Sequence, residues 1–436
     1  MTNQIDLNLT TTLPTVTEDT LAEYLTANKD DVDAYTMFGE VAAKLYSSIP
    51  VENNLYLAKD KVPNIISKKK LSQEQDEVVE KRKANADTLA LILNQSSFGS
   101  TGVFVKLLHS GFSVRLKPLT ATEKVDIEYR IANSIIKLDR STAGHIHTAL
   151  HVKIMEVVLD TFISKIDYTT VNVNNDKLLK LIKVKDNNLI LMALIVSMYP
   201  NGYNYAYLCG EKIKSTNPDE GDTLCGNIYT NGTDDRVKIN LEEMLYLRDD
   251  LTEVELAQIN KTTKASITEA EVIKYQENFK YNQPDNLEIS EFNLSITIDS
   301  GNNRDYLSTS NQWVTETIIG NEQFNRDDID SLLTLANASA VGEYIYCIDR
   351  IESPTHYADK KTINSSHVDI LSSNKGITNL IVNASISHLN KSIYTLGVPK
   401  YTCPTCVARM KKEGIEIPEE EVLTNINILT LFWYLV

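Results

Sequence analysis

Four cysteines lie in turn-like sequences that could bind a metal ion. Cys209 and Cys225 are each followed by glycine, and Cys403 and Cys406 form a Cys-Pro-x-Cys step. Thiolates bind zinc when tight turns present them with backbone N–H groups directed at the sulfurs, so such steps recur in zinc knuckles. Four converging cysteines would form a closed, tetrahedral structural zinc site, which contributes on the order of 10 kcal/mol to folding.

The spacing divides this candidate site into two halves. Cys403 and Cys406 can form a knuckle by themselves, whereas the other half needs Cys209 and Cys225, which have fifteen residues between them. Two alternatives stay open, namely unpaired thiols on surface loops and a redox Cys-x-x-Cys pair. The redox pair is less favoured because the step does not follow a strand of a thioredoxin-like βαβ unit.

The remaining cysteine and three histidines have simpler interpretations. Cys347 lies in the apolar run 344–348, which predicts a buried strand and an inert thiol. On one helix His147 and His151 would share a face, but His145 would point elsewhere, and no His-Glu-x-x-His pattern is present. We therefore expect these histidines near the start of a helix, with a catalytic metal site as the alternative.

The composition and motifs exclude several functional classes. The 436 residues are 42% hydrophobic and 23% charged, as in ordinary globular proteins, with a formal net charge of −16 that disfavours nucleic-acid binding. No nucleotide-binding glycine loop or hydrolase Gly-x-Ser-x-Gly elbow occurs, so an enzymatic function has no positive support. The lysines at 68–70 and the basic residues at 81–83 flank an acidic stretch, which favours a solvated helix face over a phosphate site.

No segment of the sequence predicts membrane insertion or secretion. The best apolar run, Leu189–Met198, has about half the length of a membrane-spanning helix. The first twenty residues are rich in threonine and lack the basic and apolar blocks of a secretory signal. We expect synthesis in the cytoplasm without processing.

The pattern of apolar residues predicts an α+β protein in four parts. These are a helical N-terminal arm or domain (1–94), a helical domain with short hairpins and a cysteine loop (95–245), an inserted mixed α/β segment (246–400), and a cysteine knuckle with an apolar end (401–436). The two cysteine-bearing parts would together form a zinc-ribbon-like element.

Particular elements follow from alternation, capping and helical spacing. A hairpin is predicted within 97–116, a capping box at Thr120 to Glu123 starts a helix near Ala121, and the most buried helices are expected at 149–163 and 188–198. Further expected elements are strands at 203–209, 237–241 and 287–298, and helices at 17–45, 72–93, 251–280 and 327–336.

The apolar C-terminal segment 425–436 must pack either on the protein's own core or on another subunit. We favour packing on its own core, next to the cysteine knuckle.

The order of these features resembles the baseplate hub family of contractile-tailed, T-even-like phages. The resemblance covers about 95–245: a hairpin, the Arg115 to Pro118 step into a helix, two apolar helices, the knuckle cysteines Cys209 and Cys225, and a closing strand with Val237, Ile239 and Leu241. The sequence departs from the family pattern because its first two cysteines are widely spaced and its Cys-Pro-x-Cys step lies near the terminus.

This resemblance implies a structural part of the virion, without enzymatic turnover, that assembles with other baseplate and tail hub proteins as a hetero-oligomer. Two alternatives remain: a tail-assembly chaperone that is absent from the mature virion, and a metal-dependent enzyme that uses His145, His147 and His151.

Overall fold

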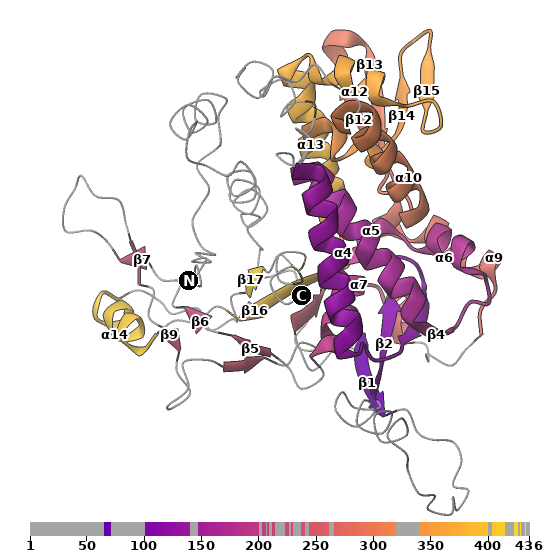
Figure 1. Ribbon diagram of the computed structural model, residues 1–436. Coiled ribbons are helices and arrows are strands. Elements are labelled where there is room, and N and C mark those ends of the chain that lie inside the picture. The colour runs from indigo at the N-terminus through magenta and orange to yellow at the C-terminus, as the bar shows by residue number, and fades with distance from the viewer. Residues whose placement is uncertain are drawn as a thin grey trace, which may run out of the picture.

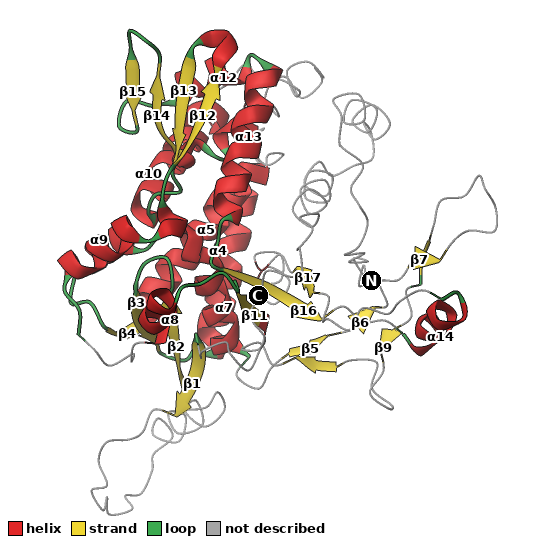
Figure 2. Cartoon of the chain, turned by 180° about the vertical axis from the view of Figure 1, so that it is seen from behind, coloured by secondary structure: helices red, strands yellow, loops and turns green. Residues whose placement is uncertain are grey.

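The computed structural model describes several ranges of the chain. They are 65–70, 101–139, 147–199, 244–260, 266–319, 340–399 and 403–414, with short stretches at 203–205, 207–208, 212–213, 223–225, 228–229, 237–239, 338, 423–425, 428 and 432. These ranges contain both helices and sheets (Figures 1 and 2), which confirms the predicted α+β class.

The first sheet has four antiparallel strands, paired in chain order. They are β1 (Ile66–Lys70), β2 (Thr101–Leu107), β3 (Phe112–Leu116) and β4 (Ile166–Thr169). The predicted hairpin is β2 and β3, whose turn uses Gly111 in the left-handed region at φ +82. Glycine adopts this conformation without the steric cost that a Cβ adds.

The prediction of a solvated helix for the lysines at 68–70 is wrong. These residues belong to β1, where Lys68 pairs with Val103 and Lys70 with Thr101. Ile65 and Ile66 are buried, so hydrophobic anchoring and pairing with β2 determine the extended conformation. A run of three lysines carries no alternation, which hid this strand in the sequence.

Three long helices pack beside this sheet and confirm the predicted elements. They are α4 (Ala121–Asp139), α5 (His147–Lys165) and α7 (Asn187–Met198). The capping box at the start of α4 is present: the Thr120 backbone N–H donates to Glu123 at 2.8 Å, and the Glu123 N–H donates to the Thr120 hydroxyl at 3.3 Å. These bonds satisfy backbone donors that the first helical turn would otherwise leave unpaired.

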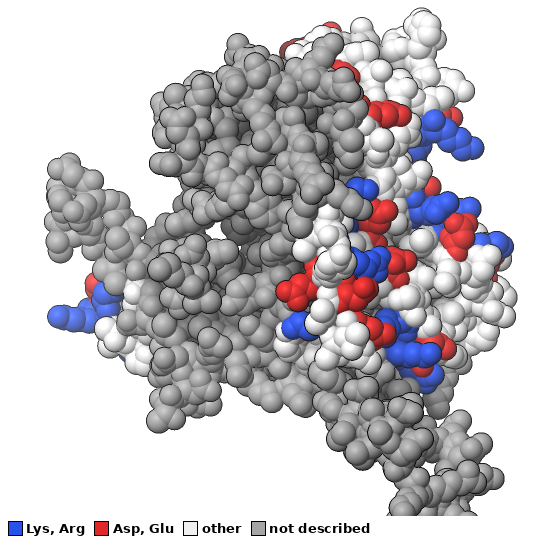
Figure 3. Space-filling view, in the orientation of Figure 1, with Lys and Arg blue, Asp and Glu red and all other residues white. Residues whose placement is uncertain are grey.

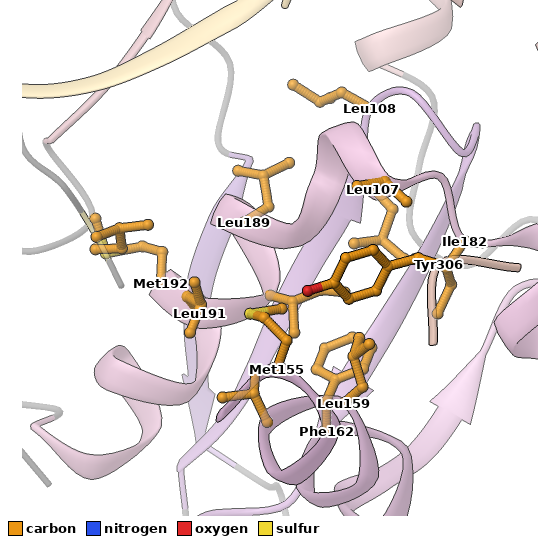
Figure 4. Close-up of a cluster of buried hydrophobic side chains, with 14 of the residues drawn as sticks. Leu107, Leu108, Met155, Leu159, Phe162, Ile182, Leu189, Leu191, Met192 and Tyr306 are labelled. Carbon is orange, nitrogen blue, oxygen red and sulfur yellow. The ribbon is translucent and has the colours of Figure 1, made fainter. Parts of the chain in front are cut away.

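Helix α7 lies at the centre of the main hydrophobic core. Every residue from Leu189 to Met198 is buried, because α7 contacts β2 and α5. Figure 4 shows Leu189, Leu191 and Met192 of α7 in the cluster that also holds Met155 of α5. A helix that is apolar on all sides is stable only inside a protein, so α7 organises the surrounding elements.

A second antiparallel sheet lies at the opposite end of these helices (Figure 1). Its strands pair in chain order: β12 (Asp285–Ile289), β13 (Leu294–Ile298), β14 (Ile348–Glu352) and β15 (Tyr357–Asp359). The predicted strand region 287–298 is therefore a hairpin of two strands. The prediction that Cys347 lies in a strand is wrong, because 345–347 form a short 3₁₀ helix and β14 begins one residue later.

Further α-helices lie elsewhere in the described residues. They are α6 (Asn175–Leu181), α8 (Glu253–Asn260), α9 (Glu269–Asn278), α10 (Asn303–Trp313), α12 (Ser365–Ser372), α13 (Lys375–Asn390) and α14 (Pro404–Lys412). Helices α8 and α9 confirm the polar helical stretch expected at 251–280. The helices expected at 17–45, 72–93 and 327–336 lie outside the described residues.

A three-stranded sheet connects distant parts of the chain. Its order is β11 (Leu245–Leu247), β16 (Tyr394–Pro399) and β17 (Leu423–Asn425). Ile428 and Phe432 follow β17 and are buried in the main core, which confirms that they pack on the protein's own core. They do not belong to the separate cysteine cluster, so the predicted place next to the knuckle is not confirmed.

The described surface carries mixed charge. On the face in Figure 3, acidic and basic side chains of the described residues are interspersed over the same area. Within the described ranges, no helix combines the length and apolar character that crossing a bilayer requires.

Candidate metal centre

Three of the four predicted cysteines converge. The sulfur atoms of Cys225, Cys403 and Cys406 all lie within 4.8 Å of one another. The Sγ atoms of Cys225 and Cys403 are 3.7 Å apart, although these residues are 178 positions apart in the chain. Within the part of the chain that the structure describes, this is the one group of at least three His, Cys, Asp or Glu residues close enough to hold a metal ion.

The spacing of these sulfurs fits a thiolate metal site. Zinc–sulfur bonds are about 2.3 Å long, so two sulfurs on a tetrahedral zinc are roughly 3.8 Å apart. The distance of 3.7 Å between Cys225 and Cys403 agrees with that geometry. Cys403 and Cys406 are each 3% exposed, and Cys225 is half-buried, so little water reaches the cluster. The donor set and its burial therefore suit a metal ion held by thiolates.

The start of α14 presents two of the thiols. Cys403 is the N-cap residue, Pro404 is the first helical residue, and the Cys406 N–H donates to the Cys403 sulfur at 3.4 Å. Proline suits this position because it needs no N–H partner and already has a helical φ. Of the nine residues of α14, only Cys406 is buried. The thiol cluster is therefore the main buried contact of this helix.

Cys225 reaches the cluster from a region of short strands. The strand β6 (Tyr207–Leu208) pairs with β9 (Ile228–Tyr229), and β7 (Lys212–Ile213) pairs with β8 (Thr223–Leu224). Cys225 directly follows β8. Figures 1 and 2 both show α14 beside β7 and β9, on the side of the molecule away from α4.

The fourth predicted ligand, Cys209, lies outside the described residues. Its neighbour Leu208 is described and pairs with Ile228. The strands expected around this cysteine loop are present as β5 (Tyr203–Tyr205), β6 and β10 (Val237–Ile239), and β5 pairs with β10.

Cys347 is separate from the cluster. It is fully buried in the main core, and this burial raises the pKa of its thiol to about 12. The prediction of a buried core thiol is confirmed, while its predicted strand context is not.

Within the described residues, no cluster that could hold a metal ion includes a histidine. His147 is the first residue of α5, as expected for a helix-start histidine, and His145 lies outside the described residues. The Nδ1 atom of His151 is 3.8 Å from a carboxylate oxygen of Glu343. Burial raises the pKa of Glu343 to about 8, which favours the neutral carboxyl group beside this imidazole.

A buried polar network, which the sequence did not predict, lies between the two four-stranded sheets. His109 Nδ1 is 2.9 Å from Asn282 Oδ1, and the Asn282 amide donates to the His109 carbonyl at 2.9 Å. The Ile393 N–H donates to His109 Nε2 at 3.4 Å, so the ring proton of a neutral His109 lies on Nδ1. Each ring nitrogen thus has an intramolecular partner.

The network also includes charged residues from the turn before α7. Burial raises the pKa of Asp186 to about 6, lowers the pKa of Lys185 to about 8 and lowers the pKa of His109 to about 3. The Lys185 ammonium donates to the Tyr281 carbonyl at 2.6 Å. These bonds join 95–199 to 280–394, so we assign the network a structural role. The only sequence signal was a Lys-Asp pair directly before an apolar helix.

A second buried histidine, His388, supports the second sheet. His388 of α13 accepts a hydrogen bond from the Ser300 N–H at 3.1 Å, and its Nδ1 lies 2.9 Å from the Asp285 carboxylate. Burial and the positive charge of Lys185 lower the pKa of His388. The ring therefore bridges two segments as a neutral group.

Comparisons with models of known protein families, with curated proteins and with solved structures gave no match.

Proposed function

We propose that this protein is a structural component of a contractile phage tail baseplate, in its hub or wedge region. In this role it is made in the host cytoplasm, is retained in the virion, and acts through contacts with other baseplate and tail hub proteins in a hetero-oligomer. The observation that carries the proposal is the cluster of Cys225, Cys403 and Cys406, which joins distant chain segments outside the main core.

In this proposal the cluster is a structural zinc site with Cys209 as its fourth ligand. A zinc ion bound there would neutralise thiolate charge and crosslink the ligands. Cys209 directly follows Leu208, whose partner Ile228 is three residues beyond Cys225. The pairing of the flanking strands thus supports a zinc-ribbon-like element, into which 246–400 would be inserted.

The elements behind the family resemblance also support the proposal. The hairpin β2–β3 leads through the capped turn at Thr120 into α4, and α5 and α7 follow before the cysteine region. Helix α7 is buried from Leu189 to Met198, and α5 buries one face that includes Met155, Leu159 and Phe162. This order is the one that the resemblance implies for 95–245.

An assembly role agrees with the chemistry of the described residues. With Cys209 as the fourth ligand, the thiol cluster would have no open coordination position of the kind that catalytic zinc sites keep for water or substrate. The buried imidazoles of His109 and His388 each bond within the protein at both ring nitrogens. We therefore propose a protein without enzymatic turnover.

Elemental analysis of the purified full-length protein tests the metal site. We expect about one zinc per chain, lost in Cys403→Ser together with a fall in melting temperature. Cys347→Ser is the matched control, because this cysteine is buried away from the cluster, and it should retain zinc. A metal-free wild-type protein of equal stability would contradict the zinc site. Zinc retained after alanine replaces all four proposed ligands, but lost with the three histidines, would favour the enzyme instead.

The place of the protein in the virion needs a separate measurement. Quantitative mass spectrometry of purified phage particles should find the chain at a fixed ratio to other tail proteins. A tail-assembly chaperone would be abundant in infected cells but missing from finished particles. If this chain is absent from finished particles, the structural proposal is overturned, whereas the zinc measurement is unaffected.

A further inference from the structure

We propose that Cys225 and Cys403 form a disulfide bond when the cluster is oxidised, and that this bond replaces the metal as the link between their chain segments. The inference builds on the proposed function, because it concerns the same thiol cluster in a particle that leaves the cell. It adds a second, covalent state of that cluster.

The geometry favours this pair over the other thiols. The sulfurs of Cys225 and Cys403 are 3.7 Å apart, close to van der Waals contact, and a disulfide needs about 2.05 Å. Cys403 is an N-cap residue in extended backbone conformation, at φ −68 and ψ 155, outside the regular turns of α14. A small rotation of its side chain can therefore close the remaining distance while α14 stays intact.

Cys406 is less suited to this bond. It lies within the first turn of α14, where its N–H bonds to the Cys403 sulfur. A Cys403–Cys406 bond would connect residues three positions apart and would constrain only that turn. A Cys225–Cys403 bond closes a loop of 178 positions, which removes far more freedom from the unfolded chain.

The oxidation balances with a hydroperoxide as the oxidant. Two thiols and one hydrogen peroxide give one disulfide and two water molecules, and the two electrons and two protons pass from the sulfurs to the peroxide oxygens. When zinc is bound, the two sulfurs are thiolates, so the two protons come from the solvent; the disulfide that forms no longer binds the ion, which loses two ligands and is released. Cys406 keeps its thiol.

The two states suit two surroundings. In the reducing cytoplasm thiols persist and can bind zinc, whereas disulfides persist outside the cell. A metal-linked cluster formed during assembly would thus become a covalently linked one after release. The segments that carry Cys225 and Cys403 would stay connected in the zinc-bound state and in the oxidised state.

The test uses the zinc-loaded full-length protein and dilute hydrogen peroxide. A chromogenic chelator measures released zinc, and peptide mass spectrometry without reducing agent maps the new bond. We expect zinc release together with a crosslinked peptide pair that contains Cys225 and Cys403 and has lost two hydrogen atoms. Dithiothreitol should reverse the crosslink and restore zinc binding.

Matched variants make the result decisive. Cys225→Ser should reduce the crosslink to background, while Cys347→Ser and Cys406→Ser should retain it. A Cys403–Cys406 or Cys209–Cys225 bond as the main product, or unchanged thiols after zinc release, would overturn the inference. If the protein never binds zinc but still forms the Cys225–Cys403 crosslink on oxidation, the metal site fails and the disulfide inference survives.

Discussion

Ser110 donates two hydrogen bonds to the buried carboxylate of Asp186, from its backbone N–H at 2.8 Å and from its hydroxyl at 2.6 Å. The His109 N–H donates to the same carboxylate at 3.0 Å. These contacts tie the turn of the β2–β3 hairpin to the N-terminus of α7. The Asp186 carboxylate is thus stabilised by these hydrogen bonds. Its negative charge also interacts favourably with the positive end of the α7 helix dipole.

Replacing Asp186 by alanine should therefore destabilise the fold. The variant leaves the N–H groups of His109 and Ser110 buried without acceptors, and each such loss costs about 1–3 kcal/mol. Because burial raises the pKa of Asp186 to about 6, its charge is itself costly at pH 7, and we expect a net loss of about 2–3 kcal/mol. Urea denaturation at pH 7 measures this loss of unfolding free energy. The control Ser110→Ala keeps both N–H bonds to Asp186 and loses the hydroxyl's bonds to Asp186 and to the Lys183 N–H, so it should cost less; equal losses would contradict this account.

His109 should make stability depend on pH. Burial lowers the pKa of this imidazole from 6.5 to about 3, so the unfolded chain binds more protons than the folded chain between those values. The stabilisation is complete above pH 6.5 and is lost as pH falls towards 3, amounting to roughly 3–5 kcal/mol. Asp186 and Glu343 act oppositely, between pH 3.8 and 6 and between pH 4.5 and 8, because burial raises their pKa values.

As pH is lowered from 6.5 to 4.5, the wild type should therefore lose more unfolding free energy, or gain less, than His109→Gln, because only the wild type loses the contribution of the neutral buried imidazole. Denaturant titrations at several pH values give both curves. Parallel curves for the variant and the wild type would show that His109 does not control the acid response.

Gly342 should tolerate no side chain. A Cβ at this position would lie 2.2 Å from the Trp313 ring, whose side chain is almost completely buried. The ring cannot move without disturbing its neighbours, so Gly342→Ala should lower the unfolding free energy by about 1–3 kcal/mol. In Gly376→Ala the nearest atom would be 3.2 Å away, on the side chain of Asn374, so this control should have a smaller effect. Thermal unfolding compares the two variants, and similar melting temperatures would contradict the prediction.

Metal removal should affect α14 and leave α7 unchanged. The thiol cluster is separate from the main core, and Cys406 is the buried residue of α14, whereas Leu189–Met198 are buried independently of the cysteines. Hydrogen exchange with and without a zinc chelator should show loss of protection in 404–412 and constant protection in 189–198. Equal loss in both helices would mean that the metal site supports the whole fold.

Local signals explain which elements the sequence could predict. The capping box at Thr120, the apolar runs of α5 and α7 and the alternation in β2 and β3 each determine a structure within about twenty residues. The strand β1 lacked such a signal, because its extended form depends on pairing with β2, more than thirty residues away.

The candidate site likewise has one part that the local sequence predicts and one part that it does not. The Cys-Pro-x-Cys step predicted the knuckle at Cys403 and Cys406, because the N-cap, proline and first turn are all local. The buried network around His109 escaped detection, because His109 meets Asn282 only after the two sheets assemble. Its members are common polar residues without fixed spacing. Only the folded chain makes them partners.

The strand β16 gives the protein a mechanical property. It is held on one side by β11 and on the other by β17, and it ends four residues before Cys403. Tension applied at α14 along this strand would load the hydrogen bonds on both edges together, in shear, and shearing resists rupture better than peeling bonds apart one by one. The connection between α14 and the core is therefore built to transmit a pull.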